Sequence, residues 1–224
     1  ASLLQLRTAD QEEWSEELLS AVGVNPELFP EIGDCSKLLG EVGSKASIES
    51  GIPIGTPVFF GSVDGASAAL EAGAIDPGIV AEMTGTSTVL IMPTDGSVRS
   101  SAFVAMSHAV PNRELQLGAM VASGASVQWL HEKILGNKTS IEQLTKGAER
   151  VNPGSAGLIF LPYMMGERSP IWNTNARGVF FGLSLTTTPE SMVRAVLEGT
   201  SFALLHNIEI ARSIGLPVAE VRSI

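Results

Sequence analysis

Asp64 is the acidic residue whose place in the sequence is best suited to chemistry. It follows an apolar run from Val58 to Phe60, which predicts a buried strand, and it precedes an alanine-rich stretch that predicts a helix ending at Gly73. Open α/β sheets bind ligands where strands end and the N–H groups of the next helix are unpaired. A carboxylate there can take a proton from a bound hydroxyl, and it can equally cap the helix by accepting a backbone N–H. These residues alone leave both interpretations open.

A second polar site follows about 20 residues later in the chain. The residues Thr84-Gly85-Thr86-Ser87 interrupt an apolar, β-branched segment from Ile79 to Thr94, a pattern that predicts a hairpin with a tight, hydroxyl-rich tip. Backbone N–H groups and hydroxyls at such a tip can bind a phosphate, and the glycine lets the oxyanion approach the backbone. A plain turn of this composition needs no ligand.

Two further motifs admit a structural and a functional interpretation. The run VASGASVQWL predicts an ordinary core helix that starts after Gly124, with Ser123 or Ser126 as its cap. The run GERSPIWNTNARG carries Glu167 and Arg168, which could act as a catalytic acid and an oxyanion clamp. We favour a structural role in which both charges bind loop backbone that is otherwise unpaired.

Together these motifs resemble the FGGY family of carbohydrate kinases, and the likeness extends over nearly the whole chain. The segment WSEELLSAVGVNPELFPEI is also similar to the corresponding part of xylulokinase-type members. The resemblance implies that Asp64 is the general base for the sugar hydroxyl, that Asp64 and Gly65 contact the sugar, and that Asp64 binds Mg²⁺ through a water. It also implies a set of residues that bind ATP through the turn and the following helix: Gly85, Thr86, Ser87, Gly124 and Gln128.

The order of the predicted elements indicates an α/β protein with a mixed sheet flanked by helices. Strands are predicted within 79–93 and at 102–107, 115–120, 158–161 and from 218, and helices at 123–135, 140–151 and 189–214. A helix at 8–22, a strand at 38–42 and a short helix at 45–50 precede them. The family resemblance implies the ribonuclease-H-like core of the actin, hexokinase and Hsp70 superfamily. It further implies a partial two-domain kinase, with 1–76 ending the sugar-binding domain and 77–224 forming a nucleotide-binding domain truncated before its adenine motif.

Composition narrows the classes of partner. The 224 residues carry a formal charge of −10, which argues against nucleic acid and anionic membranes. Cys35 is the single cysteine, so an internal disulfide is excluded and a reducing compartment is expected. No apolar run reaches the length of a bilayer span. We therefore expect a cytoplasmic protein, with a homodimer as one possible assembly.

Single residues outside the motifs receive structural interpretations. His108, His131 and His206 lack the spacing of metal ligands, so we expect structural or surface roles. Met164 and Met165 are expected to fill the core.

The implied activity is ATP-dependent phosphorylation of a sugar hydroxyl, with D-xylulose as the first candidate substrate and D-xylulose 5-phosphate as its product. Gluconate or another polyol or sugar acid is the alternative, because Gly65 stands where many xylulose and glycerol kinases carry Asn or Gln, whereas gluconate kinases of the family often have Asp-Gly. A non-catalytic module that binds sugar or nucleotide is a further alternative. The family's N-terminal phosphate loop and C-terminal adenine motif lie outside this sequence, so we expect the 224 residues alone to have little kinase activity.

Overall fold

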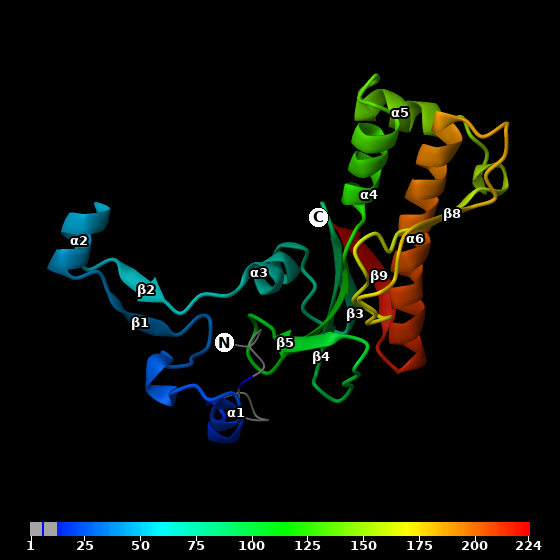
Figure 1. The fold of residues 1–224 in the computed structure, drawn as a ribbon. Coiled ribbons are helices and arrows are strands. Elements are labelled where there is room, and N and C mark those ends of the chain that lie inside the picture. Colours follow the sequence, from blue (N-terminus) through cyan, green and yellow to red (C-terminus); the bar gives the residue numbers. More distant parts are fainter. Residues whose placement is uncertain (1–5, 7–12) are drawn as a thin grey trace.

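A mixed five-stranded sheet forms the centre of the fold in the computed structural model, which describes residue 6 and residues 13–224 (Figure 1). Its strands are β3 (Gly78–Thr84), β4 (Thr88–Thr94), β5 (Val104–Ser107), β6 (Glu114–Met120) and β9 (Val218–Ser223). They lie in the order β5-β6-β4-β3-β9, and every neighbouring pair is antiparallel except β3 and β9. The predicted hairpin is confirmed, since residues 85–87 connect β3 to β4.

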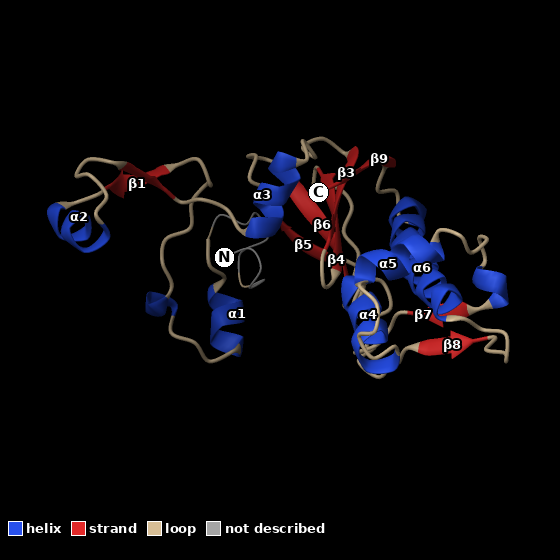
Figure 2. Cartoon of the chain, turned by 90° about the horizontal axis from the view of Figure 1, so that it is seen from above, coloured by secondary structure: helices blue, strands red, loops and turns tan. Residues whose placement is uncertain are grey.

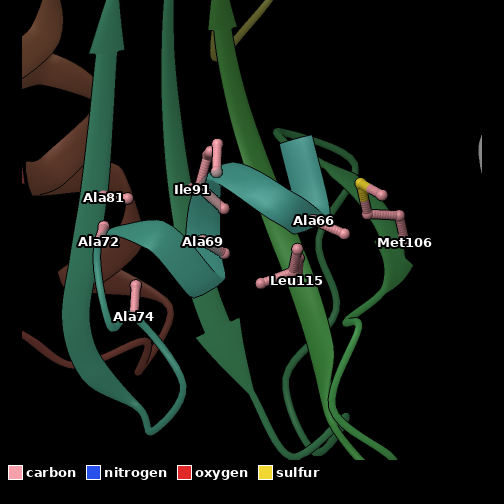
Figure 3. Close-up of a cluster of buried hydrophobic side chains, with 9 residues drawn as sticks. Ala66, Ala69, Ala72, Ala74, Ala81, Ile91, Met106 and Leu115 are labelled. Atoms are coloured by element: carbon pink, nitrogen blue, oxygen red, sulfur yellow. The ribbon is translucent and has the colours of Figure 1, made fainter. Parts of the chain in front are cut away.

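Helix α3 (Asp64–Glu71) crosses one face of this sheet (Figure 3). Its buried alanines, among them Ala66 and Ala69, pack against Ile91 and Leu115 of the strands. Alanine has no side chain beyond Cβ, so the helix can lie close to the sheet. The helix ends as predicted at Gly73, which has a φ of +63°, and the N–H of Ala74 closes the last turn on the Ala69 carbonyl at 2.8 Å.

Helix α6 (Pro189–Ser213) covers the opposite face. Its C-terminal half packs against β3 and β4 through Ala211, Val80 and Leu90, each fully buried. Its N-terminal half joins a second cluster with α4 (Gly124–Trp129), α5 (Ile141–Ala148) and β7 (Ile159–Leu161), which lie next to it in Figure 2. Neither α6 nor another helix in the described part of the chain is long and apolar enough to cross a membrane.

Two elements of this half differ from the sequence prediction. The helix predicted over 123–135 is α-helical to Trp129 and continues as a π-helix over Leu130–Ile134. The segment between β7 and α6, predicted as loop, contains the strand β8 (Val179–Phe181), which pairs antiparallel with β7. Two short 3₁₀ helices span Pro26–Leu28 and Ser155–Gly157.

The helix predicted over 8–22 is shorter in the structure. Residues 8–12 lie outside the described residues. Within the described part, α1 (Glu16–Ala21) begins after Ser15, whose hydroxyl accepts the N–H of Leu18, so the prediction was wrong for residues 13–15. Serine at this position satisfies an N–H that the first helical turn leaves unpaired.

The strand before Asp64 is present but exposed. β1 (Leu38–Glu41) and β2 (Pro57–Phe59) form a two-stranded antiparallel sheet that carries α2 (Ser44–Ser50) and projects from the five-stranded sheet (Figures 1 and 2). Val58 is 38% exposed and Phe59 51%, so the prediction of a buried strand was wrong. A single two-stranded ribbon has no second layer in the described residues to cover it.

Candidate active site

Asp64 is the first residue of α3, and its side chain is exposed. The N-cap position belongs to Val63, so Asp64 does not cap the helix in the expected way. Its Oδ1 accepts the N–H of Gly65 at 2.7 Å, an unpaired donor of the first turn. An ionised carboxylate at this end of a helix is favoured by the helix dipole. Asp64 is therefore a solvent-accessible acceptor at the start of a helix whose other side is fixed to the sheet.

The far end of α3 is held by two side chains from elsewhere in the chain. Arg222 of β9 donates from Nη1 to the carbonyl of Ala72 at 2.8 Å. His108 lies 2.9 Å from the Ala74 carbonyl through Nε2, while its Nδ1 accepts the N–H of Val110. The proton therefore sits on Nε2, and the buried His108 has the structural role that was predicted for it.

An open cavity of about 860 Å³ lies beside the start of α3. The residues that lead into Asp64, 61–63, form part of its wall, together with the polar side chains of Asp34, Lys37 and Arg113. Cys35, a free thiol, also lines it. A cavity of this size with polar groups on several sides is large enough for a sugar.

The Gly85–Ser87 turn is fixed to the N-terminus of α4 by backbone hydrogen bonds. The carbonyl of Thr86 accepts the N–H groups of Ser123 and Ala125, each at 3.1 Å, and the carbonyl of Gly85 accepts the N–H of Gly124 at 3.1 Å. A Cβ on Gly124 would lie 2.4 Å from the Gly85 oxygen. Glycine is therefore required at position 124 for the turn and the helix to be this close.

Four of the five predicted ATP-binding residues meet at this junction: Gly85, Thr86, Ser87 and Gly124. Gln128 lies one helical turn beyond Gly124 on α4, is exposed, and donates to Glu132 at 2.8 Å. No hydrogen bond within the described residues joins Asp64 to the turn. The structure thus brings the phosphate candidates together and sets the carboxylate apart, on the helix that crosses the sheet.

The loop that contains Glu167 and Arg168 forms hydrogen bonds with the backbone at the end of β6. Oε1 of Glu167 accepts the N–H of Val121 at 2.9 Å and that of Arg168 at 2.8 Å, and the N–H of Ser169 reaches the Ala119 carbonyl. Burial raises the pKa of Glu167 despite these N–H donors and the nearby Arg168. The structural interpretation of Glu167 is confirmed, while Arg168 is exposed.

The two methionines of this region have different environments. Met164 packs against the cluster around α6. Met165 is 79% exposed, so the prediction that it fills the core was wrong.

One polar residue beside the turn was missed from the sequence. Glu82 lies in β3, is 7% exposed, and binds hydroxyls of Thr84 and Ser223. The available signal was an acidic residue inside the otherwise apolar run IVAEM. Among the described residues, no group of three or more His, Cys, Asp or Glu side chains could hold a metal ion by itself.

The sequence that forms this sheet and the junction between the turn and α4 matches a known protein family. The family profile described as "FGGY family of carbohydrate kinases, C-terminal domain" matches residues 80–223. The chain belongs to this family, and the resemblance drawn from the sequence is confirmed. Its mixed α/β sheet flanked by helices, of the actin, hexokinase and Hsp70 type, is confirmed as well.

The similar proteins are named for two different substrates, gluconate and xylulose. The gluconokinase of Bacillus subtilis is 31% identical over 202 residues, which cover 86% of this chain and 39% of the relative. The xylulose kinase of Staphylococcus xylosus is 30% identical over 220 residues, 95% of this chain and 44% of the relative. The crystal structure described as a "xyloylose kinase" from Brucella ovis superposes with a TM-score of 0.85 at 28% identity, covering 95% of this chain and 44% of that one. The chain thus spans less than half the length of these relatives.

Proposed function

We propose that the protein phosphorylates a sugar hydroxyl with ATP. The observation that carries this proposal is the Gly85–Ser87 turn, fixed by three backbone hydrogen bonds to the N-terminus of α4 in a chain of the carbohydrate kinase family. The first N–H groups of α4 are bonded to the carbonyls of the turn, so we assign the phosphate oxygens to the N–H groups and hydroxyls of Thr86 and Ser87 in the turn itself. Family membership favours this function over a non-catalytic binding module.

Asp64 is the proposed general base. Its carboxylate is exposed and directly follows residues 61–63, which line the 860 Å³ cavity. We propose this cavity as the sugar pocket, with Gly65 as a contact of the bound sugar. The base accepts the proton of the attacking hydroxyl as the oxygen bonds to the terminal phosphorus of ATP, and ADP leaves with the electrons of the broken bond. Phosphoryl transfer depends chiefly on positioning and electrostatic stabilisation, which the turn and α4 supply through Thr86, Gly124 and Gln128.

A magnesium ion suits the proposed donor set. Mg²⁺ that accompanies nucleotides is held by one or two carboxylates, by substrate phosphates and by waters. The exposed carboxylate of Asp64 offers one such ligand, through a water, and the acidic chain has few cations to neutralise phosphate. When bound, the ion would offset the charge of the phosphates.

We propose D-xylulose as the substrate and retain gluconate or a related sugar acid as the second candidate. Gly65 favours the second candidate because the family resemblance associates Asp-Gly with gluconate kinases, and a gluconokinase is among the similar proteins. Turnover measured with xylulose, gluconate and glycerol at equal concentrations distinguishes them. We also retain the division into residues 1–76 of a sugar-binding domain and 77–224 of a nucleotide-binding domain.

The test of the base is Asp64→Asn, measured in the protein together with any flanking sequence it carries. We expect the rate of sugar-dependent ADP release to fall about a hundredfold or more, with an unchanged melting temperature because the side chain is exposed. Glu142→Gln is the matched control, since Glu142 is also an exposed carboxylate in the first turn of a helix and forms a surface ion pair with Lys146. Near-normal turnover of Asp64→Asn would refute the assignment of the base.

A further inference from the structure

A hydrogen-bonded cluster lies at the base of the Gly85–Ser87 turn, with Glu82, Thr88 and Ser123 buried and its two other members exposed. We call it the Glu82 cluster, and it consists of one carboxylate and four hydroxyls: Glu82, Thr84, Thr88, Ser123 and Ser223. The Glu82 carboxylate accepts hydrogen bonds from the hydroxyls of Thr84 and Ser223. The hydroxyl oxygens of Thr84 and Thr88 are 2.6 Å apart, and Thr88 donates to Ser123 at 2.7 Å. The cluster thus connects β9, β3 and β4 to the N-cap of α4.

The cluster includes the residues on both sides of the turn. Thr84 is the last residue of β3 and Thr88 the first of β4, and the two lie opposite each other in the antiparallel ladder. Ser123 receives the hydrogen bond of Thr88 and donates its own N–H to the Thr86 carbonyl. A path of polar contacts therefore runs from Glu82 to the peptide group at the tip of the turn: Thr84 donates to Glu82, the hydroxyl oxygens of Thr84 and Thr88 are in contact, and Thr88 donates to Ser123.

Packing alone does not account for Glu82. Its neighbours Val80 and Ala81 are fully buried and apolar, as expected for a central strand. A carboxylate that is 7% exposed loses much of its hydration, and the ion pairs of the described residues do not include Glu82. The two hydroxyl donors compensate for that loss and tie the carboxylate to the turn.

We propose that Glu82 is a positioning residue for the nucleotide. Through Thr84, Thr88 and Ser123 it fixes the separation between the turn and the start of α4, where the phosphates of ATP would bind. This inference rests on the proposed function of the turn and concerns residues that do not themselves contact the nucleotide. Loosening the cluster misplaces the phosphate-binding N–H groups and leaves the sugar pocket beside α3 unaffected.

The test compares two buried threonines of the same strand. Thr88 and Thr94 are each 3% exposed and lie at opposite ends of β4, and the hydroxyl of Thr94 accepts the N–H of Gly96. Valine replaces threonine with nearly the same volume, so Thr88→Val and Thr94→Val each remove one buried hydroxyl. Binding of ADP with Mg²⁺ is measured by calorimetry on the protein together with any flanking sequence it carries. We expect the Kd to rise about tenfold in Thr88→Val and less than about twofold in Thr94→Val.

Steady-state kinetics distinguish a positioning role from a purely structural one, because only a positioning role changes the KM for ATP without changing the KM for the sugar. Thr88→Val should raise the KM for ATP and leave the KM for the sugar unchanged. Ser223→Ala removes a donor to Glu82 at the exposed end of β9 and should act in the same direction, which covers the case that Thr88→Val folds poorly.

Equal ADP affinity in Thr88→Val and Thr94→Val would overturn the inference. Thr86→Val separates this failure from failure of the proposed function, since Thr86 is exposed at the turn itself. If Thr86→Val weakens ADP binding and Thr88→Val does not, the turn binds phosphate without the Glu82 cluster. If Thr86→Val also binds ADP normally, the proposed role of the turn is refuted.

Discussion

Gly124→Ala should disrupt the junction of the turn and α4 while changing little else. Gly124 has a helical backbone that alanine adopts readily, so the effect of the substitution is steric. The added Cβ would lie 2.4 Å from the carbonyl oxygen of Gly85, and ordinary contacts begin at 3.4 Å. The turn and the helix must therefore separate by about 1 Å.

The expected magnitude follows from that displacement. A shift of about 1 Å in groups that position a substrate reduces the rate about a hundredfold. The overpacked contact should also lower the free energy of unfolding by about 1–3 kcal/mol. Three hydrogen bonds between residues 85–86 and 123–125 would lengthen at the same time. We expect kcat/KM for ATP to fall about a hundredfold.

Gly199→Ala is the matched control for this steric effect. A Cβ on Gly199 would lie 2.2 Å from the carbonyl oxygen of Phe160, where α6 packs on β7. This variant should lose comparable stability in thermal unfolding while its KM for ATP stays close to that of the original protein. If both variants lose stability equally and both keep their affinity for ATP, the closeness of Gly124 to the turn has no role in nucleotide binding.

Two further substitutions test the supports of the site. Because burial raises the pKa of Glu167 above the unfolded value of 4.5, its contribution to stability is fully present below pH 4.5 and is lost as the pH rises through the folded pKa. We therefore expect the free energy of unfolding of the original protein, measured by chemical unfolding, to fall relative to that of Glu167→Gln as the pH rises from 4.5 through the folded pKa. A difference between the two proteins that stays constant with pH would contradict the raised pKa. Arg222→Ala removes the donor to the Ala72 carbonyl, so amide exchange in the last turn of α3 should accelerate about fivefold, an effect of about 1 kcal/mol. The surface variant Lys146→Ala, which breaks an exposed ion pair on α5, should leave exchange in α3 unchanged.

Local sequence patterns predicted the parts of the site that depend on local structure. The hairpin around Gly85 follows from β-branched residues on either side of a polar tip, and the end of α3 follows from Gly73. Both features are determined by backbone conformation over a few residues. Gly124 was identified by the family resemblance, and the structure adds the steric reason for glycine there.

Features that depend on distant contacts could not be predicted in this way. The contact between Glu82 and Ser223 joins residues 141 positions apart, and no pattern around either residue indicates the other. The exposure of Phe59 depends on which layers surround a two-stranded ribbon, whereas its sequence resembles that of a buried strand. The strand β8 is three residues long and exists because β7 provides a partner.

The position of Asp64 relative to the Gly85–Ser87 turn depends on β9, although Asp64 and the turn both lie outside this strand. Arg222 and Ser223 are consecutive, so their side chains lie on opposite faces of the sheet. Arg222 holds the C-terminal carbonyls of the helix that begins with Asp64, and Ser223 holds the carboxylate at the base of the turn. Both contacts require the parallel register in which Arg222 pairs with Ala81 and Ser223 with Glu82. A shift of one residue would exchange the faces of the two side chains and break both contacts together. The pairing of β3 with β9 therefore contributes to holding the helix of the proposed base and the base of the proposed phosphate site in one arrangement, together with the alanine packing of α3 and the bonds between the turn and α4.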